Sequence, residues 1–259
     1  MDRWKRLHDV GFWITGAGTG FGRALAVALG CAEARVFLTG RRKSKLLESV
    51  EEAAAMGASR ANFFVLPADI TSEEQIAETV RIIDTTGLGL RGVVNSAAIA
   101  QRRRSEWPLM EETTEFWHDI LTTNLLGSWL VTKSAVPLMV RGGAIRVLFL
   151  SSEAGWANTA GVGQYNVSKA ALNSLGASVA EECALRYPEV DVQINVLVPG
   201  EARTEMNQGS RNSPYTLASM ALLLLSHARG GPNGKFFHRD GRHLEFAYST
   251  TYTKNLSDL

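Results

Sequence analysis

The sequence predicts an α/β fold of three layers, in which a doubly wound parallel sheet carries helices on both faces. Short apolar runs rich in β-branched and aromatic residues alternate with longer amphipathic stretches along the chain. Such runs are typical of strands buried on both faces, and strand–helix alternation favours a parallel sheet. In these folds ligands bind beyond the carboxyl ends of the strands, so we expect functional residues just after the apolar runs.

About seven strands are expected. They lie at 10–15, 34–39, 62–67, 92–95, 145–151 and 192–199, with a seventh at 234–238. Helical patterns occupy 23–34 and 72–84, and Thr71 or Ser72 is a suitable N-cap for the second of these helices.

The 259 residues form one expected domain, with a core at about 10–246 and a polar tail at 247–259. A net charge of +1 gives no reason to expect nucleic acid as a partner. The apolar cluster at 221–225 is too short to span a bilayer, and the N-terminus lacks the pattern of a signal peptide.

Two cysteines, Cys31 and Cys183, form neither a metal motif nor a disulfide framework, so we expect a cytoplasmic protein with free thiols. The histidines His227, His238 and His243 have no convincing spacing for a metal, and no metal site is expected.

A glycine-rich turn follows the first expected strand. TGAGTGFGRAL at 15–25 holds Gly16, Gly18, Gly20 and Gly22. Glycine lets a phosphate approach the backbone, and the following helix offers unpaired amides and the positive end of its dipole. A turn without a ligand is the alternative, but its place between a strand and a helix favours phosphate binding.

The second expected strand ends in a basic loop, LTGRRKSK at 38–45. A fold that binds NAD usually has a carboxylate here for the ribose, whereas cationic side chains suit the 2′-phosphate of NADP. We assign this role to Arg41 and, less firmly, to Arg42. Lys43 and Lys45 are better explained as solvated residues. Asp69, after the third strand, could accept from the adenine amino group or simply cap a turn.

Tyr165 precedes Lys169 by four residues inside an expected helix, so the two side chains should share one face. A phenol is a poor base at neutral pH, but a nearby ammonium favours its phenolate. The pair can be an acid–base device, or two residues that share a helix face by chance.

Taken together, these segments resemble the short-chain dehydrogenase/reductase family over residues 10 to about 241. The similar segments are TGAGTGFG, NSAA at 95–98, TTNLLGSWLVTKSAVPLM at 122–139, LFLSSEAG at 148–155, the Tyr–Lys pair and VPGEART at 198–204. Each is weak alone, whereas six in the family's order are specific. The resemblance implies a Rossmann-type fold and an NADP(H)-dependent oxidoreductase that interconverts a carbonyl and an alcohol, with NAD(H) less favoured.

The resemblance also implies the catalytic residues. Tyr165 would be the general acid/base, and Lys169 would lower its pKa and hold the nicotinamide ribose. Ser152, preferred over Ser151, would hydrogen-bond the substrate oxygen. Asn124 would hold a water that links Lys169 to solvent.

The cofactor residues implied by the resemblance run from the glycine turn to the segment after the sixth strand. They are Gly16, Gly18, Thr19, Gly20, Phe21, Gly22, Arg41, Arg42, Asp69, Ile70, Asn95, Ala97, Tyr165, Lys169, Pro199, Gly200, Ala202 and Thr204.

Some positions depart from the family's pattern. Ser96 and Ala98 replace its second asparagine and its glycine, which predicts local repacking. Ala202 stands where a larger aliphatic residue is common, and Thr19 where NADP-binding members often have a basic residue. The NADP preference therefore depends mainly on Arg41.

The substrate mouth is expected in the loops at 98–107, 153–163 and 201–212. Ser152, Glu153, Trp156 and Glu201 are the candidate substrate residues, with Gln101 and Arg203 as further polar groups, and they indicate a polar small molecule. Trp156 could equally be packing, and Arg102, Arg103 and Arg104 fit a solvated loop or a subunit contact better than a substrate contact.

The resemblance further implies a homotetramer or homodimer, formed through the last strand and the long helices around 118–140 and 164–186. Two other functions stay open. One is a dinucleotide-binding regulator or scaffold without chemistry, and the other is an NAD-dependent epimerase or dehydrogenase of the sugar type. The latter usually has a larger C-terminal domain than the roughly sixty residues present here.

Overall fold

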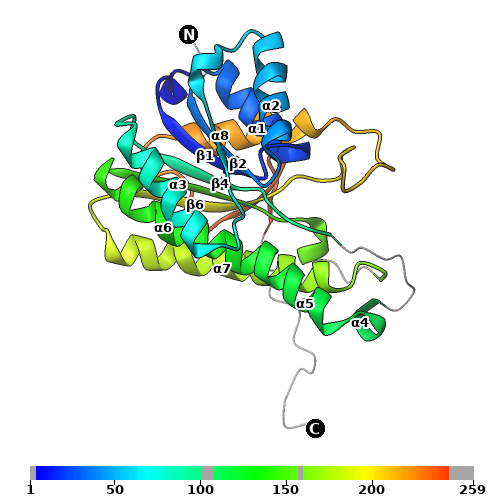
Figure 1. Ribbon diagram of the computed structural model, residues 1–259. Helices are drawn as coiled ribbons and strands as arrows, with labels where there is room; N and C mark the ends of the chain where they lie inside the picture. The colour runs from blue at the N-terminus through cyan, green and yellow to red at the C-terminus, as the bar shows by residue number, and fades with distance from the viewer. Residues whose placement is uncertain (1–3, 101–107, 157–159, 245–259) are drawn as a thin grey trace, which may run out of the picture.

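The computed structural model describes residues 4–100, 108–156 and 160–244 (Figure 1). Eight strands form one sheet in the order β3-β2-β1-β4-β5-β6-β7-β8. The strands are β1 Gly11–Thr15, β2 Arg35–Gly40, β3 Phe63–Pro67, β4 Gly92–Asn95, β5 Ala144–Leu150, β6 Asp191–Val198, β7 Phe236–His238 and β8 His243–Leu244. The pairs from β3 to β7 are parallel, which confirms the predicted fold class.

The strand count of about seven was one too low. β8 has two residues and pairs antiparallel with β7, with Phe237 opposite His243. Two residues are too few to show a hydrophobic period, so no pattern in the sequence could reveal this strand.

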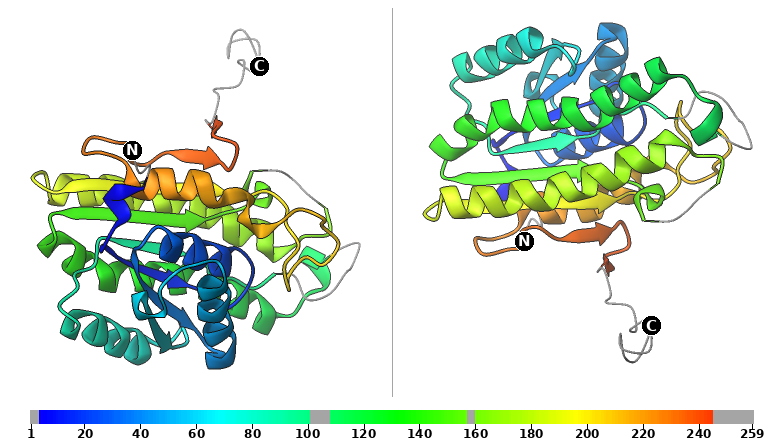
Figure 2. Two further views of the ribbon diagram at one scale, coloured as in Figure 1. Left: turned by 90° about the horizontal axis from the view of Figure 1, so that it is seen from above. Right: turned by 90° about the horizontal axis from the view of Figure 1, so that it is seen from below.

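Helices cover both faces of the sheet, as Figures 1 and 2 show. The main helices are α1 Gly20–Cys31, α2 Lys43–Ala55, α3 Glu73–Thr85, α6 Ser128–Arg141, α7 Gln164–Arg186 and α8 Ala218–Ser226. One core cluster joins α1, α2 and α8 to one face, with Phe12 and Ile14 from β1. The other joins α3, α6 and α7 to the opposite face, with Trp13 from the same strand. Successive side chains of β1 point to opposite faces of the sheet, so this strand contributes to both core clusters.

Shorter helices lie near the carboxyl ends of the strands: α4 Pro108–Glu111, α5 Thr114–Leu121, η4 Glu153–Gly155 and η5 Pro214–Leu217. The long helix expected around 118–140 is continuous but contains a π-helical turn: α5 leads into η3 Thr122–Gly127, which leads into α6, with helical backbone at both junctions. The remaining 3₁₀ turns are η1 Lys5–Leu7 and η2 Arg60–Asn62. Among the described residues, no helix is both long and apolar enough to cross a bilayer.

Helix starts follow the capping chemistry. Ser72 is the N-cap of α3, and its Oγ accepts from the Gln75 amide at 3.3 Å. α1 begins at Gly20, three residues earlier than its apolar pattern indicates, because the glycine turn feeds directly into the helix. The chain reverses its winding between β1 and β4, which places the crevice of the sheet beside this turn.

Candidate active site

A cleft of about 730 Å³ opens at the carboxyl ends of the central strands. Most of the residues expected at the site line it. Of the expected cofactor residues these are Gly16, Gly18, Thr19, Gly20, Phe21, Arg41, Arg42, Asp69, Ile70, Ala97, Tyr165, Lys169, Pro199, Gly200, Ala202 and Thr204. Ser152, Glu153 and Glu201 line it as well.

The glycine turn is a backbone cradle that side chains would fill. A Cβ on Gly22 would lie 2.3 Å from the Gly16 carbonyl oxygen, and one on Gly16 would lie 2.8 Å from Ala97 Cα. Gly16 and Gly20 also have positive φ. No side chain caps the N-terminus of α1 at Thr19, so the first amides of the helix stay open to a ligand. The cradle therefore fits a bound phosphate.

Thr15 joins this turn to the end of β4. Its Oγ1 accepts from the amides of Ser96 and Ala97 at 3.1 and 3.2 Å. The Ser96 hydroxyl lies 3.0 Å from the position of a Cβ on Gly22. Ser96, one of the departures from the family pattern, therefore packs against the glycine turn.

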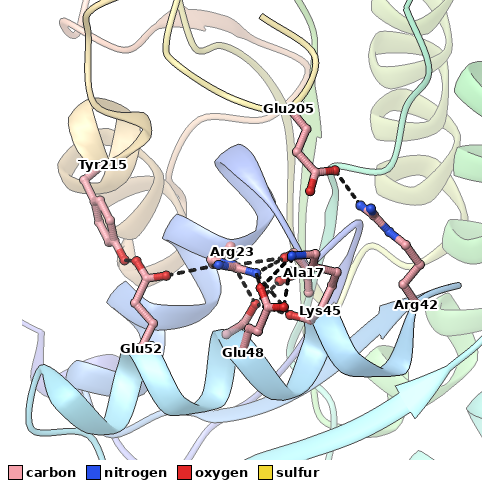
Figure 3. Close-up of polar contacts among 10 residues, drawn as sticks. Ala17, Arg23, Arg42, Lys45, Glu48, Glu52, Glu205 and Tyr215 are labelled. Carbon is pink, nitrogen blue, oxygen red and sulfur yellow. Dashed lines mark hydrogen bonds and ion pairs between the residues drawn. The ribbon is translucent and has the colours of Figure 1, made fainter. Parts of the chain in front are cut away.

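Arg23, the first residue after the glycines, holds the turn from outside (Figure 3). Its guanidinium donates to the Gly18 carbonyl at 2.5 and 2.9 Å and to Ser49 Oγ at 3.1 Å. It also pairs with Glu48 and Glu52 on α2. Because all these partners are structural, Arg23 positions the cradle and is not available as a phosphate ligand.

The basic side chains after β2 differ in their partners. Arg42 Nη2 donates to Glu205 Oε2 at 2.6 Å, and Lys45 pairs with Glu48 one turn along α2. Arg41 is exposed and makes no hydrogen bond or ion pair within the described part of the chain. Its guanidinium, at the edge of the cleft, is therefore open to an anion.

Asp69 and Ile70 border the cleft after β3. Asp69 Oδ1 accepts from the amide and the hydroxyl of Thr71 at 2.9 and 2.8 Å, which is the turn-capping role left open by the sequence. Ile70 packs on Gly127, where a Cβ would lie 2.7 Å from Ile70 Cδ1.

The catalytic candidates meet at the other end of the cleft. Tyr165 lies in the first turn of α7, and its hydroxyl hydrogen-bonds Ser152 at the end of β5. The Lys169 ammonium lies 5.6 Å from the centre of the Tyr165 ring and donates to the Leu150 carbonyl at 2.7 Å. Ser151 points elsewhere, since its Oγ donates to Asn173 Oδ1 at 2.5 Å. The preference for Ser152 agrees with this geometry.

Burial dominates the protonation of this cluster. It raises the pKa of the Tyr165 phenol to about 12; the Ser152 hydrogen bond opposes this shift and the Glu153 carboxylate adds to it. Burial also lowers the pKa of Lys169 to about 8. Burial is the largest cause of the raised pKa of Tyr165 and Lys169 is not among its causes, so the expectation that Lys169 lowers this pKa stays a prediction.

Asn124 is fully buried in the π-helical turn η3. Its Oδ1 accepts from the Ile99 amide at 2.8 Å, and its Nδ2 donates to the Ile99 carbonyl at 2.9 Å and to Ser168 Oγ at 3.0 Å. The side chain thus ties the segment after β4 to α7, next to Lys169. π-helical turns often occur at functional sites, and this one places the Asn124 side chain between Ile99 and Ser168.

Four expected residues do not line the cleft: Asn124, whose contacts are given above, Gly22, Asn95 and Trp156. Gly22 is a spacer behind the cradle, and Asn95 donates to Thr132 Oγ1 on α6 at 2.8 Å. Trp156 packs edge-on against Phe236 of β7, with ring centres 5.1 Å apart, which favours the packing alternative.

Three residues of the site had no expected role. Glu205 lines the cleft and pairs with Arg42. His238, at the end of β7, lies 3.4 Å from Glu153 and 2.8 Å from Asp240. Arg239 donates to the Glu201 carbonyl at 3.1 Å and to Thr216 Oγ1 at 2.9 Å. Glu205 directly follows the VPGEART segment, whereas His238 and Arg239 lie far from every motif, and no spacing in the sequence signals the partners of any of the three.

The expectations for Gln101, Arg102, Arg103 and Arg104 and for the tail at 247–259 lie outside the described residues. Among the described residues, no group of three His, Cys, Asp or Glu side chains could hold a metal ion.

The comparisons agree with this geometry. The family model described as short chain dehydrogenase matches residues 12–214. The 3-oxoacyl-acyl-carrier-protein reductase FabG of Aquifex aeolicus is 27% identical over 244 residues, which cover 88% of this chain and 94% of the relative. The 11-beta-hydroxysteroid dehydrogenase 1A of Arabidopsis thaliana is 32% identical over 205 residues, covering 79% of this chain and 56% of that one.

A solved metagenomic short-chain oxidoreductase in complex with NADP is 26% identical, with a TM-score of 0.74, and the match covers 88% of this chain and 95% of that one. The Rossmann-type sheet, the glycine cradle and the tyrosine–lysine cluster define a nucleotide-binding oxidoreductase. The chain belongs to the short-chain dehydrogenase family.

Proposed function

We propose that the protein is an NADP(H)-dependent oxidoreductase that interconverts a carbonyl and an alcohol, with Tyr165 as the general acid/base. The supporting observation is the meeting of Tyr165, Ser152 and Lys169 in one cleft with the glycine cradle. The same sheet carries both halves of this cleft, which supports one domain for binding and catalysis.

The cofactor assignment depends on charge. The cradle and the open amides of α1 would hold the pyrophosphate, and Arg41 would take the 2′-phosphate, with Arg42 beside it. A relative solved with NADP is consistent with this choice. When bound, the cofactor supplies or accepts the hydride.

The protein's own residues would handle the proton and the substrate. Ser152 would orient the substrate oxygen, and Tyr165 would give its proton to that oxygen during reduction and take it back during oxidation. Lys169 would hold the ribose and take part in the proton path. Asn124 would position Lys169 through Ser168, and a water at Asn124 completing the relay stays a prediction.

A polar, uncharged or cationic substrate suits the mouth. The carboxylates of Glu153 and Glu201 line it, and the Glu201 carboxylate makes no hydrogen bond or ion pair within the described residues. Carboxylates accept hydrogen bonds from substrate hydroxyls and repel anions. Hydroxylated ketones and sugars should therefore be turned over better than apolar ketones, and a reversed order of kcat/KM would contradict this proposal.

Association through helices is also proposed. Leu126, Trp129 and Val167 are exposed on η3, α6 and α7, and η3 packs against α7. These side chains could form an interface between copies, giving a homodimer or homotetramer. Light scattering coupled to gel filtration measures the mass, and a monomer at all concentrations would contradict the proposal.

The main test separates binding from chemistry. Tyr165→Phe should bind NADPH as the wild type does, while turnover of carbonyl substrates falls by about 10²–10⁴-fold, since proton transfer is lost. Tyr187→Phe, a tyrosine at the end of α7, is the matched control. Arg41→Ala should weaken NADPH binding about tenfold and leave NADH nearly unchanged.

The alternatives give different outcomes. A wild-type protein that binds NADPH but reduces no carbonyl compound in a broad panel would support the scaffold function instead. A stronger affinity for NADH than for NADPH would mean that the basic loop does not select the phosphorylated cofactor.

A further inference from the structure

The segment after β6 crosses the cleft as a compact loop. The Thr204 amide donates to the Asn207 carbonyl at 3.0 Å, and the Asn207 amide donates back to Thr204 Oγ1 at 3.0 Å. The Arg203 amide donates to the Asn212 carbonyl at 2.8 Å. These hydrogen bonds close the loop on itself.

Two contacts connect this loop with the cofactor half of the cleft. Thr204 Cγ2 lies 3.0 Å from the position of a Cβ on Gly20, at the start of α1. One residue further, Glu205 Oε2 accepts from Arg42 Nη2 at 2.6 Å. Figure 3 shows this pair reaching across from the loop to the start of α2. The loop therefore lies against the glycine cradle at Gly20 and against the start of α2 at Arg42.

The two neighbouring arginines differ in this respect. The Arg41 guanidinium is open, whereas that of Arg42 is already taken by the Glu205 carboxylate. Both side chains of the pair are about half exposed, at 57% and 50%. Exposed ion pairs of this kind contribute only about 0–1 kcal/mol, so a better anion can replace the carboxylate.

A 2′-phosphate is such an anion. It carries more charge than a carboxylate and three acceptor oxygens, and guanidinium–phosphate contacts are among the strong hydrogen bonds. Glu205 and the phosphate cannot share the same Arg42 nitrogen, and their charges repel each other. Resting on the proposed NADP(H) function, we propose that Glu205 is a cofactor-specificity residue, which occupies Arg42 in the free protein and is displaced by the 2′-phosphate.

Displacement has a consequence for the loop. Once the 2′-phosphate takes Arg42, the loop loses its ion pair with the start of α2 and keeps the contact of Thr204 with Gly20. A cofactor without the phosphate leaves the pair intact. Glu205 therefore makes the position of the 201–207 segment respond to the 2′ substituent.

The test uses fragments that need no turnover. Adenosine 2′,5′-bisphosphate and 5′-AMP are titrated calorimetrically into the wild type and Glu205→Gln at one salt concentration. We expect the variant to bind the bisphosphate about three- to fivefold more tightly, because no carboxylate has to be displaced. Its affinity for 5′-AMP should change by less than about twofold.

Two further variants identify the cause. Glu51→Gln breaks the exposed pair between Glu51 on α2 and Arg60 in η2 and removes the same charge, so it should leave both affinities unchanged. In an Arg42→Ala background the gain from Glu205→Gln should disappear, since the two residues act as one pair.

Three results would overturn the inference: no gain in Glu205→Gln, weaker binding of both fragments, or an equal gain without Arg42. The proposed function fails differently. If the wild type binds neither NADPH nor NADH, both proposals fall, whereas NADPH binding with any of the three results refutes the role of Glu205 alone.

Discussion

Tyr165 shows how one side chain's surroundings set its chemistry. Its phenol is held in a desolvated position next to Ser152 and Glu153, with Lys169 beyond the ring. Since the pKa is raised to about 12, the tyrosine carries its proton at neutral pH. The Tyr165 hydroxyl can therefore donate a proton at neutral pH, as reduction requires.

The direction of this shift predicts a pH dependence. We expect alcohol oxidation to rise with pH through the alkaline range, because it requires loss of the Tyr165 proton, while carbonyl reduction stays nearly constant around neutrality. Initial rates in both directions measure this. Glu153→Gln should move the oxidation profile to lower pH, since the Glu153 carboxylate raises the pKa of Tyr165. Flat oxidation rates from neutral to alkaline pH would contradict the assignment.

Burial of the Lys169 ammonium is expected to destabilise the folded protein. The side chain is 4% exposed and its pKa falls to about 8 from 10.5. Below about pH 8 the folded protein must keep a buried charge, so Lys169→Met should raise the free energy of unfolding by about 1–2 kcal/mol while activity is lost.

The sign of the pH effect follows from linkage. Between pH 8 and 10.5 the unfolded chain still binds the proton that the folded protein lacks, so wild-type stability rises relative to the variant. Urea unfolding of both proteins at several pH values measures the difference. A difference that grows in this pH window would contradict the prediction.

At the scale of elements, the site depends on how closely α1 approaches the end of β1. That approach requires glycine at Gly22, whose Cβ would lie 2.3 Å from a backbone oxygen. Arg23 then fixes the turn to α2. The π-helical turn between α5 and α6 plays the matching part on the catalytic side by placing Asn124.

Gly22→Ala should therefore disturb the cradle. Overpacking of this kind costs about 1–3 kcal/mol, and we expect NADPH affinity to fall by about tenfold or more as the turn shifts. Gly209→Ala, where the nearest atom lies 3.7 Å from the new Cβ, is the control. Fluorescence titration and thermal unfolding measure the two effects. Unchanged NADPH affinity in Gly22→Ala would show that the turn does not hold the cofactor.

At the scale of the whole molecule, the carboxyl ends of the strands form the candidate site, whereas the amino ends stabilise the fold. The carboxyl ends carry the cleft, and the opposite ends of β5 and β6 carry a buried ion pair of Arg146 and Asp191. Arg146 also donates to the carbonyls of Asp191 and His227, which joins the segment after α8 to the sheet. Burial opposes ionisation of Asp191, but hydrogen bonds from Arg146 and Gln193 keep its pKa below the usual value.

Asp191→Ala should destabilise the protein and leave the cleft intact. The Arg146 side chain is 3% exposed, and a buried charge that loses its partner costs about 3–5 kcal/mol. Chemical unfolding should show this loss, while the Kd for NADPH in native conditions stays unchanged. Glu51→Ala, which breaks an exposed pair, should cost less than about 1 kcal/mol. Equal losses in the two variants would contradict the difference in burial.

The sequence by itself determined seven of the eight strands and the glycine cradle, and it predicted the catalytic side chains. Seven strands show apolar runs because buried strands need them, and the glycines and the Tyr165–Lys169 spacing are local patterns. The phosphate role that it assigns to Arg41 and Arg42 stays a prediction, and the ion pairs of Arg42 and Lys45 could not be read from the sequence.

Only the tertiary structure decided what depends on contacts between distant segments. These are the two-residue strand β8, the π-helical turn within the 118–140 helix and the raised pKa of Tyr165. The ion pairs of Glu205 with Arg42 and of His238 with Glu153 also belong here. Arg42 and Glu205 are 163 positions apart, so no local spacing relates them. The desolvation of Tyr165 likewise depends on the segments that pack around it, and the spacing between Tyr165 and Lys169 along the helix does not contain that information.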